Sequence, residues 1–134
     1  MFSRRGFVAC ALCAAGGFLA TGVEAQNAAP AGVKRTLIQQ TDGPVDGYVT
    51  MDMRVDIEPG TAVARHTHPG IESTYVVEGG IELTIDGEPA HAYAPGEGFQ
   101  VPYAKPHSAK IGSAKTVLAI TYVVEKGKPL ASPA

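Results

Sequence analysis

Turn-forming pairs that contain glycine or proline recur along this chain at short intervals. The sequence holds 16 glycines and 10 prolines. Between residues 41 and 96 such pairs stand at Gly43-Pro44, Pro59-Gly60, Pro69-Gly70, Gly79-Gly80, Asp86-Gly87 and Pro95-Gly96. No stretch keeps a helical period, and the segments between the turns have the length of strands. The pattern therefore predicts an all-β domain, either a sandwich or a barrel.

The segment 48–57 is the clearest of the predicted strands. Its apolar residues alternate with polar ones, as in a strand with one buried face. Further strands are expected at 35–40, 74–78, 81–85, 88–94, 98–101, 107–111 and 115–124, and one that carries histidines follows Pro59-Gly60. The last strand is apolar on both faces, which predicts a central position in a sheet or a contact between subunits.

Metal-ligating residue types gather in the stretch from residue 60 to 73, which reads GTAVARHTHPGIES. On a strand, His66 and His68 point to the same face because they are two residues apart. The turn at Pro69-Gly70 brings Glu72 back to the same point, and His107 offers a third imidazole. Imidazoles and a carboxylate around one point form a donor set for a divalent transition metal. We expect these four residues to be metal ligands. Glu72 is also the candidate catalytic residue, and its alternatives are a base beside the metal or an ordinary strand residue.

The same residues resemble the two motifs of the cupin superfamily. The first motif is filled, with its spacing intact, by Gly60, His66, His68, Glu72 and Gly79. The second is matched by Gly87, Pro95-Gly96-Glu97, Pro102 and His107, but the usual asparagine is missing near Ile111. The resemblance covers residues 34–125. It implies a single cupin-type jelly-roll barrel, also called a double-stranded β-helix, with the metal inside.

Strand alternation predicts what surrounds the metal. If His66 points inward, Ala62 and Ala64 do too. If His107 points inward, Ala109 and Ile111 lie on the same side of their strand. The pocket is therefore expected to be mostly apolar, as small-molecule sites are. No arginine or lysine is placed inside it, with Lys105 on the loop before His107 as the one exception.

Other polar residues fall outside this constellation. His91 lies on a strand outside both motifs and is expected at the surface. Tyr75 is out of phase with its neighbours and should face away from the metal. Only Glu72, Tyr103 and Lys105 stand as acid or base groups, and the missing asparagine removes one partner that could orient His107.

The first 25 residues resemble a twin-arginine export signal. Ser3-Arg4-Arg5-Gly6-Phe7 matches that motif apart from its later lysine, and Val23-Glu24-Ala25 reads as a cleavage site. The apolar stretch 6–20 is shorter than the roughly 20 residues of a membrane span, which makes an uncleaved anchor the weaker alternative. We expect a periplasmic or secreted protein without stable membrane insertion after cleavage. A linker at 26–33, a cupin domain at 34–125 and a flexible tail at 126–134 would follow.

Charge and cysteine content exclude several other functions. The chain has 11 basic and 13 acidic residues; without Arg4, Arg5 and Glu24, nine and twelve remain. This balance and the lack of a basic run argue against nucleic-acid binding. Both cysteines, Cys10 and Cys13, lie within the expected signal. The mature chain would therefore have no disulfide and no thiol ligand or nucleophile.

The expected ligand set leaves the identity of the metal open. Three imidazoles and a carboxylate leave free positions on a six-coordinate ion, and suit Mn, Fe, Co, Ni, Cu or Zn at one divalent ion per chain. Twin-arginine export carries folded proteins, so the metal would be loaded in the cytoplasm. That hypothesis favours Mn or Fe.

Three functions fit these features. The first is a metal-dependent enzyme acting on a small organic substrate, dioxygenase-like or else an isomerase or lyase. The second is a binding protein for a small ligand or for the metal itself. The third is a structural module that the metal stabilises. A homodimer is expected in each case, because the apolar last strand would otherwise expose a sticky surface.

Overall fold

The computed structural model describes residues 29–134. The expected signal peptide, with Arg4, Arg5, Cys10 and Cys13, lies outside the described residues, as do the first residues of the expected linker. The described part contains strands and no helices, so no helix in it is long and apolar enough to cross a membrane. The strands are β1 (Val33–Asp42), β2 (Tyr48–Ile57), β3 (Ala62–Thr67), β4 (Gly70–Glu78), β5 (Ile81–Ile85), β6 (His91–Tyr93), β7 (Gly98–Val101), β8 (His107–Lys110), β9 (Thr116–Glu125) and β10 (Ser132–Pro133).

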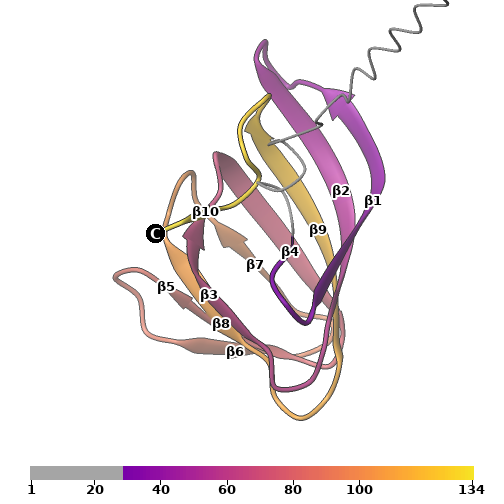
Figure 1. Ribbon diagram of the computed structural model, residues 1–134, viewed down its shortest axis with the longest axis vertical. Coiled ribbons are helices and arrows are strands. Elements are labelled where there is room, and N and C mark those ends of the chain that lie inside the picture. Colours follow the sequence, from indigo (N-terminus) through magenta and orange to yellow (C-terminus); the bar gives the residue numbers. More distant parts are fainter. Residues whose placement is uncertain (1–28) are drawn as a thin grey trace, which may run out of the picture.

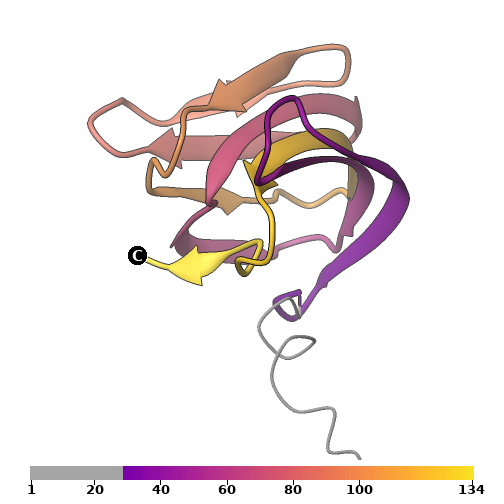
Figure 2. The ribbon, with the colours of Figure 1, turned by 90° about the horizontal axis from the view of Figure 1, so that it is seen from above.

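Two five-stranded antiparallel sheets make up the fold. The first has the order β1-β2-β9-β4-β7 and the second the order β10-β3-β8-β5-β6. Figures 1 and 2 show the two sheets facing each other and curling around a common interior. This arrangement confirms the predicted all-β jelly roll. The apolar last strand, β9, lies in the middle of the first sheet, between β2 and β4.

The core lies between the inner faces of the two sheets. Strand alternation places its residues: in β4 every second residue from Gly70 to Val76 is buried, and in β9 Leu118, Ile120, Tyr122 and Val124 are buried on one face. Opposite them, Leu83 and Ile85 of β5 and Ala109 of β8 are buried in the same cluster. The core continues to the residues that are expected to bind the metal, since β3, β4 and β8 supply both.

Gly79 shows why the first motif needs a glycine between β4 and β5. Its φ of +77° lies in the left-handed region, which is costly for residues with a side chain. A Cβ atom there would also overlap the backbone carbonyl of Lys115. The turn is held on the same side by Thr116, whose hydroxyl donates to the Gly80 carbonyl at 2.6 Å.

Most predicted strands occur, with differences at their ends. Residues 48–57, 81–85 and 98–101 form strands with the predicted bounds, whereas β1 and β4 begin earlier than expected. The expected strand 88–94 shrinks to β6, His91–Tyr93. Pro89 explains the loss, because it has no N–H to donate to a neighbouring strand.

The expected flexible tail at 126–134 does not hold. The last residues form β10, which pairs with β3 through Ser132 opposite Thr67 and Pro133 opposite His66. Leu130 is 6% exposed and belongs to the core. The two prolines of the tail suggested fraying, but a buried leucine and an added strand fix it to the second sheet (Figure 1).

Candidate metal centre

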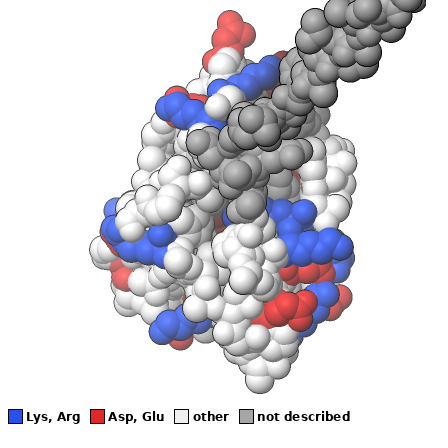
Figure 3. All heavy atoms as spheres, in the orientation of Figure 1, with Lys and Arg blue, Asp and Glu red and all other residues white. Residues whose placement is uncertain are grey.

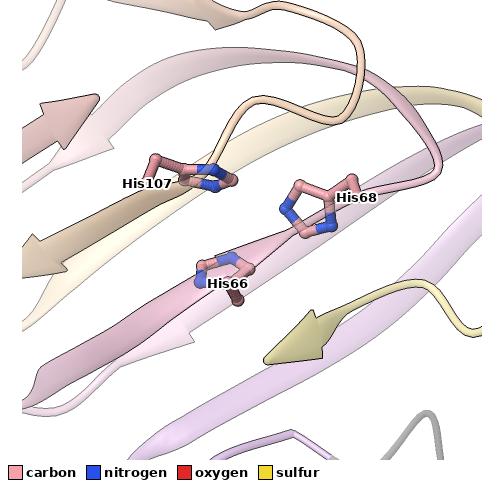
Figure 4. Close-up of side chains that lie close together, drawn as sticks. All are labelled: His66, His68 and His107. Carbon is pink, nitrogen blue, oxygen red and sulfur yellow. The ribbon is translucent and has the colours of Figure 1, made fainter. Parts of the chain in front are cut away.

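Four expected ligands lie together between the two sheets. His66 lies near the end of β3, His68 just after it, Glu72 in β4 and His107 at the start of β8. His68, Glu72 and His107 are buried, and His66 is half-buried. One ring nitrogen of each histidine lies within 4.8 Å of the others. Figure 4 shows the three rings facing one another.

Backbone carbonyls fix the orientation of all three imidazoles. His66 Nδ1 lies 2.7 Å from the Ala64 oxygen, His68 Nδ1 lies 2.6 Å from the Leu130 oxygen, and His107 Nδ1 lies 2.9 Å from the Lys105 oxygen. A carbonyl oxygen only accepts hydrogen bonds, so each Nδ1 must be the donor. In a neutral imidazole this leaves the lone pair on Nε2, which is the arrangement that metal-binding histidines need.

Glu72 faces the same nitrogens. Its Oε2 lies 2.9 Å from His68 Nε2 and 3.5 Å from His107 Nε2. Its other oxygen, Oε1, accepts a hydrogen bond of 2.6 Å from the buried Thr74 hydroxyl. The carboxylate is therefore held in one orientation, with Oε2 turned toward the histidines, where a ligand role would need it.

The protonation of the site reflects burial and close pairing. Burial alone would raise the pKa of Glu72, but its contacts with His107, His68 and Thr74 outweigh burial and lower that pKa. Burial lowers the pKa of His66 to about 4. Burial opposes a charge on His107 as well, yet the nearby Glu72 carboxylate raises its pKa overall. At neutral pH Glu72 is charged and His66 is neutral, which are the forms that bind metals.

One buried atom tests whether these residues suit a metal ion. His68 Nε2 has no hydrogen-bond partner among the described residues, although the Glu72 oxygen lies within 2.9 Å. A buried nitrogen in that state is costly unless something binds it. Two further imidazoles and a carboxylate stand around it. The donor set therefore fits a divalent transition metal.

A small interior cavity of about 50 Å³ adjoins the histidines, and one prediction about its walls is wrong. Ala62 and Ala64 are exposed, and Val63 lines the cavity in their place. The register between β3 and β8 shifts between Val63 and His66. Such a bulge inserts an extra residue, so it reverses the alternation before His66. On β8 the alternation holds, because Ala109 is buried as expected, as is Ile111 just beyond the strand.

Three residues at this site were not anticipated from the sequence. Thr74 is two residues from Glu72 on the same face of β4, so strand alternation could have found it. Tyr122 is buried in phase with Leu118 and Ile120 of β9, and its ring lies edge-on to His68 at 4.9 Å. Arg35 of β1 also lines the cavity, which contradicts the expectation that no arginine or lysine lies inside. No motif signalled it.

Several other residues lie away from the histidines. His91 is exposed, as predicted, and Tyr75 is 52% exposed on the outside of the first sheet. Tyr103 donates to Glu125 at the surface. Lys105 contributes its backbone oxygen to His107, and that contact supplies the orientation for which the motif's missing asparagine left no partner.

A jelly roll with three converging histidines and a nearby carboxylate defines the class of protein as a cupin. The sequence agrees: the family model described as "Cupin domain" matches residues 53–124, more than half of the chain. The protein therefore belongs to the cupin family. No functionally curated protein is detectably similar in sequence.

Solved structures with this fold have diverse names. A cupin-like protein from Thermotoga maritima matches with a TM-score of 0.61 and 20% identity, over 76% of this chain and 75% of that one. KdgF from a Halomonas species matches with a TM-score of 0.55 and 24% identity, over 68% of this chain and 78% of that one. DMSP lyase DddQ from Ruegeria pomeroyi matches with a TM-score of 0.63 and 18% identity, over 76% of this chain but 51% of that one. At these identities the likeness shows the fold alone.

Proposed function

We propose that the protein binds one divalent transition metal at His66, His68, Glu72 and His107, and that it acts as a metal-dependent enzyme on a small organic substrate. The observation that carries this proposal is the orientation of the histidines. Three backbone carbonyls accept hydrogen bonds from three Nδ1–H groups, which leaves the three Nε2 atoms for other partners. Among residues 29–134, the buried Nε2 of His68 has no hydrogen-bond partner. One ring nitrogen of each histidine lies within 4.8 Å of the other two, which is the arrangement that a shared metal ion requires.

A bound ion would supply Lewis-acid or redox chemistry at this point. The residues of the chain provide the rest. Thr74 holds the Glu72 carboxylate in place, and Val63 and Leu83 give the adjoining cavity apolar walls. Burial raises the pKa of Tyr122 well above its ordinary value, so this tyrosine keeps its phenolic proton and can donate it in a hydrogen bond.

Oxygenation of a small substrate is our first candidate reaction, because the cavity beside the histidines is largely apolar. A lyase or isomerase reaction is the second candidate. It is favoured by a charged carboxylate, Glu72, and a protonated phenol, Tyr122, at one site. The carboxylate could take up a proton from the substrate, and the phenol could supply one. A fold neighbour named as a DMSP lyase has the same overall architecture, which is consistent with the second candidate.

Metal analysis and oxygen uptake test the proposal together. The purified mature protein should contain about one divalent ion per chain, and the double variant His66→Ala/His68→Ala should contain none. His91→Ala, which changes an exposed histidine, is the matched control and should keep the metal. Oxygen consumption by the Fe(II) form against a panel of small substrates separates an oxygenase from the second candidate. Full metal content in the double variant would end the metal proposal.

We also propose export by the twin-arginine route, with Mn or Fe loaded before export. The support is the motif at Arg4 and Arg5, which lies outside the described residues. A reporter fused after Ala25 should reach the periplasm only with both arginines in place. Natively exported protein should then hold Mn or Fe, and Cu or Zn in that sample would contradict early loading.

A small molecule is the partner that the surface favours over nucleic acid. On the face drawn in Figure 3, basic and acidic side chains are interspersed, without one large basic area. Several of them pair directly, such as Arg54 with Asp56 and Lys126 with Asp42. Paired charges leave little net field to attract a polyanion.

A further inference from the structure

Arg35 occupies an unusual position beside the candidate metal centre. It lies on β1 and shares the half-buried face of Val33, while Lys34 between them is exposed. It lines the interior cavity together with His66, Glu72 and Tyr122. It also lines an outer cleft of about 190 Å³ with His66, Val63 and Pro133. Arg35, Val63 and His66 line both spaces, so Arg35 borders the outer cleft as well as the cavity beside the histidines.

Within residues 29–134, no carboxylate pairs with the charge of Arg35. Residues 29–134 include three arginines, of which Arg54 pairs with Asp56 and Arg65 pairs with Asp86. The side chain of Arg35 forms no hydrogen bond or ion pair within this part of the chain. Its positive field does reach the cavity, where it acts on the Tyr122 phenol against the stronger effect of burial. A half-buried guanidinium with no carboxylate partner among residues 29–134 can pair with an anion.

We propose that Arg35 binds a carboxylate group of the substrate, so that the enzyme acts on a small organic acid. This inference rests on the proposed function, since the rest of the substrate would face the metal at His66, His68, Glu72 and His107. A guanidinium pairs with a carboxylate through two parallel hydrogen bonds, which fixes both position and orientation. The two adjoining spaces are small and the cleft walls are mostly apolar, among them Pro30, Val63 and Pro133. They suit a short acid better than a sugar phosphate.

Binding of short acids to the cobalt-loaded protein tests this inference. The probes are the dicarboxylates oxalate, malonate, succinate and glutarate, each compared with its monoamide, and binding is followed by the visible spectrum of Co(II). Wild-type protein should prefer at least one dicarboxylate over its monoamide by about 10- to 100-fold, the effect of a charge-assisted hydrogen-bonded pair. Arg35→Met should abolish that preference, and Arg35→Gln should do the same if the methionine variant folds poorly.

Lys34→Met is the matched control, because it removes a neighbouring charge from the exposed face of the same strand. It should keep the full preference. All folded variants should contain the same amount of cobalt, which separates loss of the anion site from loss of the metal site. A wild-type protein without preference at any chain length, or an equal preference in Arg35→Met, would overturn the inference.

If wild-type protein takes up no cobalt, the metal proposal fails and the anion site is tested by itself. Propanoate and propanamide then serve as probes for the metal-free protein, followed by calorimetry. Propanoate should bind more tightly, and the difference should vanish in Arg35→Met. Equal binding of the two probes to wild-type protein would reject the role of Arg35 in that case too.

Discussion

Glu72 is the residue whose role decides most about this site. Its Oε2 atom lies close to His68 and His107, while Thr74 holds Oε1. This geometry suits a metal ligand. It also suits a base that stands next to the ion without binding it, since a carboxylate with one free oxygen can accept a proton.

The variant Glu72→Gln separates these roles, because it keeps the shape and removes the charge. As a ligand, Glu72 should support metal affinity, so the variant should bind Mn(II) at least about 10- to 100-fold more weakly, with the smallest loss for Cu(II). Titrations with both metals measure this. Unchanged affinity with turnover reduced by about 10²–10⁴ would instead assign Glu72 the role of general base. A lower melting temperature with no other change would indicate a structural role.

For single residues, the sequence predicted which four side chains converge and only part of what surrounds them, such as the buried Ala109 and Ile111. His66, His68, Glu72 and His107 could be found because motif spacing and strand alternation apply within one or two strands. Arg35 and Tyr122 could not, because they reach the site from β1 and β9, through pairings that no local pattern specifies. The bulge before His66 was equally hidden, so Ala62 and Ala64 were placed on the wrong face.

Among the elements, the C-terminal segment has the clearest link to the site. Leu130 packs in the core, its carbonyl oxygen accepts the hydrogen bond from His68 Nδ1, and β10 pairs with β3 beside His66. Two histidines therefore depend on residues that the sequence indicated to be a loose tail. Tertiary pairing decides the structure here, because an isolated two-residue strand has no stability of its own.

Two changes to this segment should have different effects. Leu130→Ala removes buried side-chain atoms but keeps the carbonyl, so it should lower the free energy of unfolding by about 2–4 kcal/mol while metal affinity changes little. Removal of residues 128–134 takes away the carbonyl as well, and should also weaken metal binding by about 10- to 100-fold. Thermal unfolding and metal titration measure the two effects. Equal metal affinity in the truncated and full-length chains would show that the Leu130 carbonyl does not orient His68.

For the molecule as a whole, we propose a homodimer that forms through the outer face of the first sheet. β9 lies in the middle of this sheet, and its outward residues border a broad depression. Exposed apolar side chains line the same depression: Ile38 is 62% exposed, Tyr75 52% and Val77 43%. The apolar surface predicted for the last strand therefore continues onto the neighbouring strands. Exposed apolar patches of this kind mark interaction sites. A second copy could cover the patch with the same surface, as in a two-fold dimer.

Light scattering of the mature protein at tens of micromolar should give the mass of a dimer. Val77→Glu would bury a charge in the proposed interface, so this variant should be a monomer with an unchanged metal content and a similar melting temperature. Val45→Glu is the control, because Val45 is also strongly exposed, at 61%, but lies outside the depression. This second variant should remain a dimer. A monomeric wild-type protein would refute the dimer. A dimeric Val77→Glu variant would show that the dimer forms through another face.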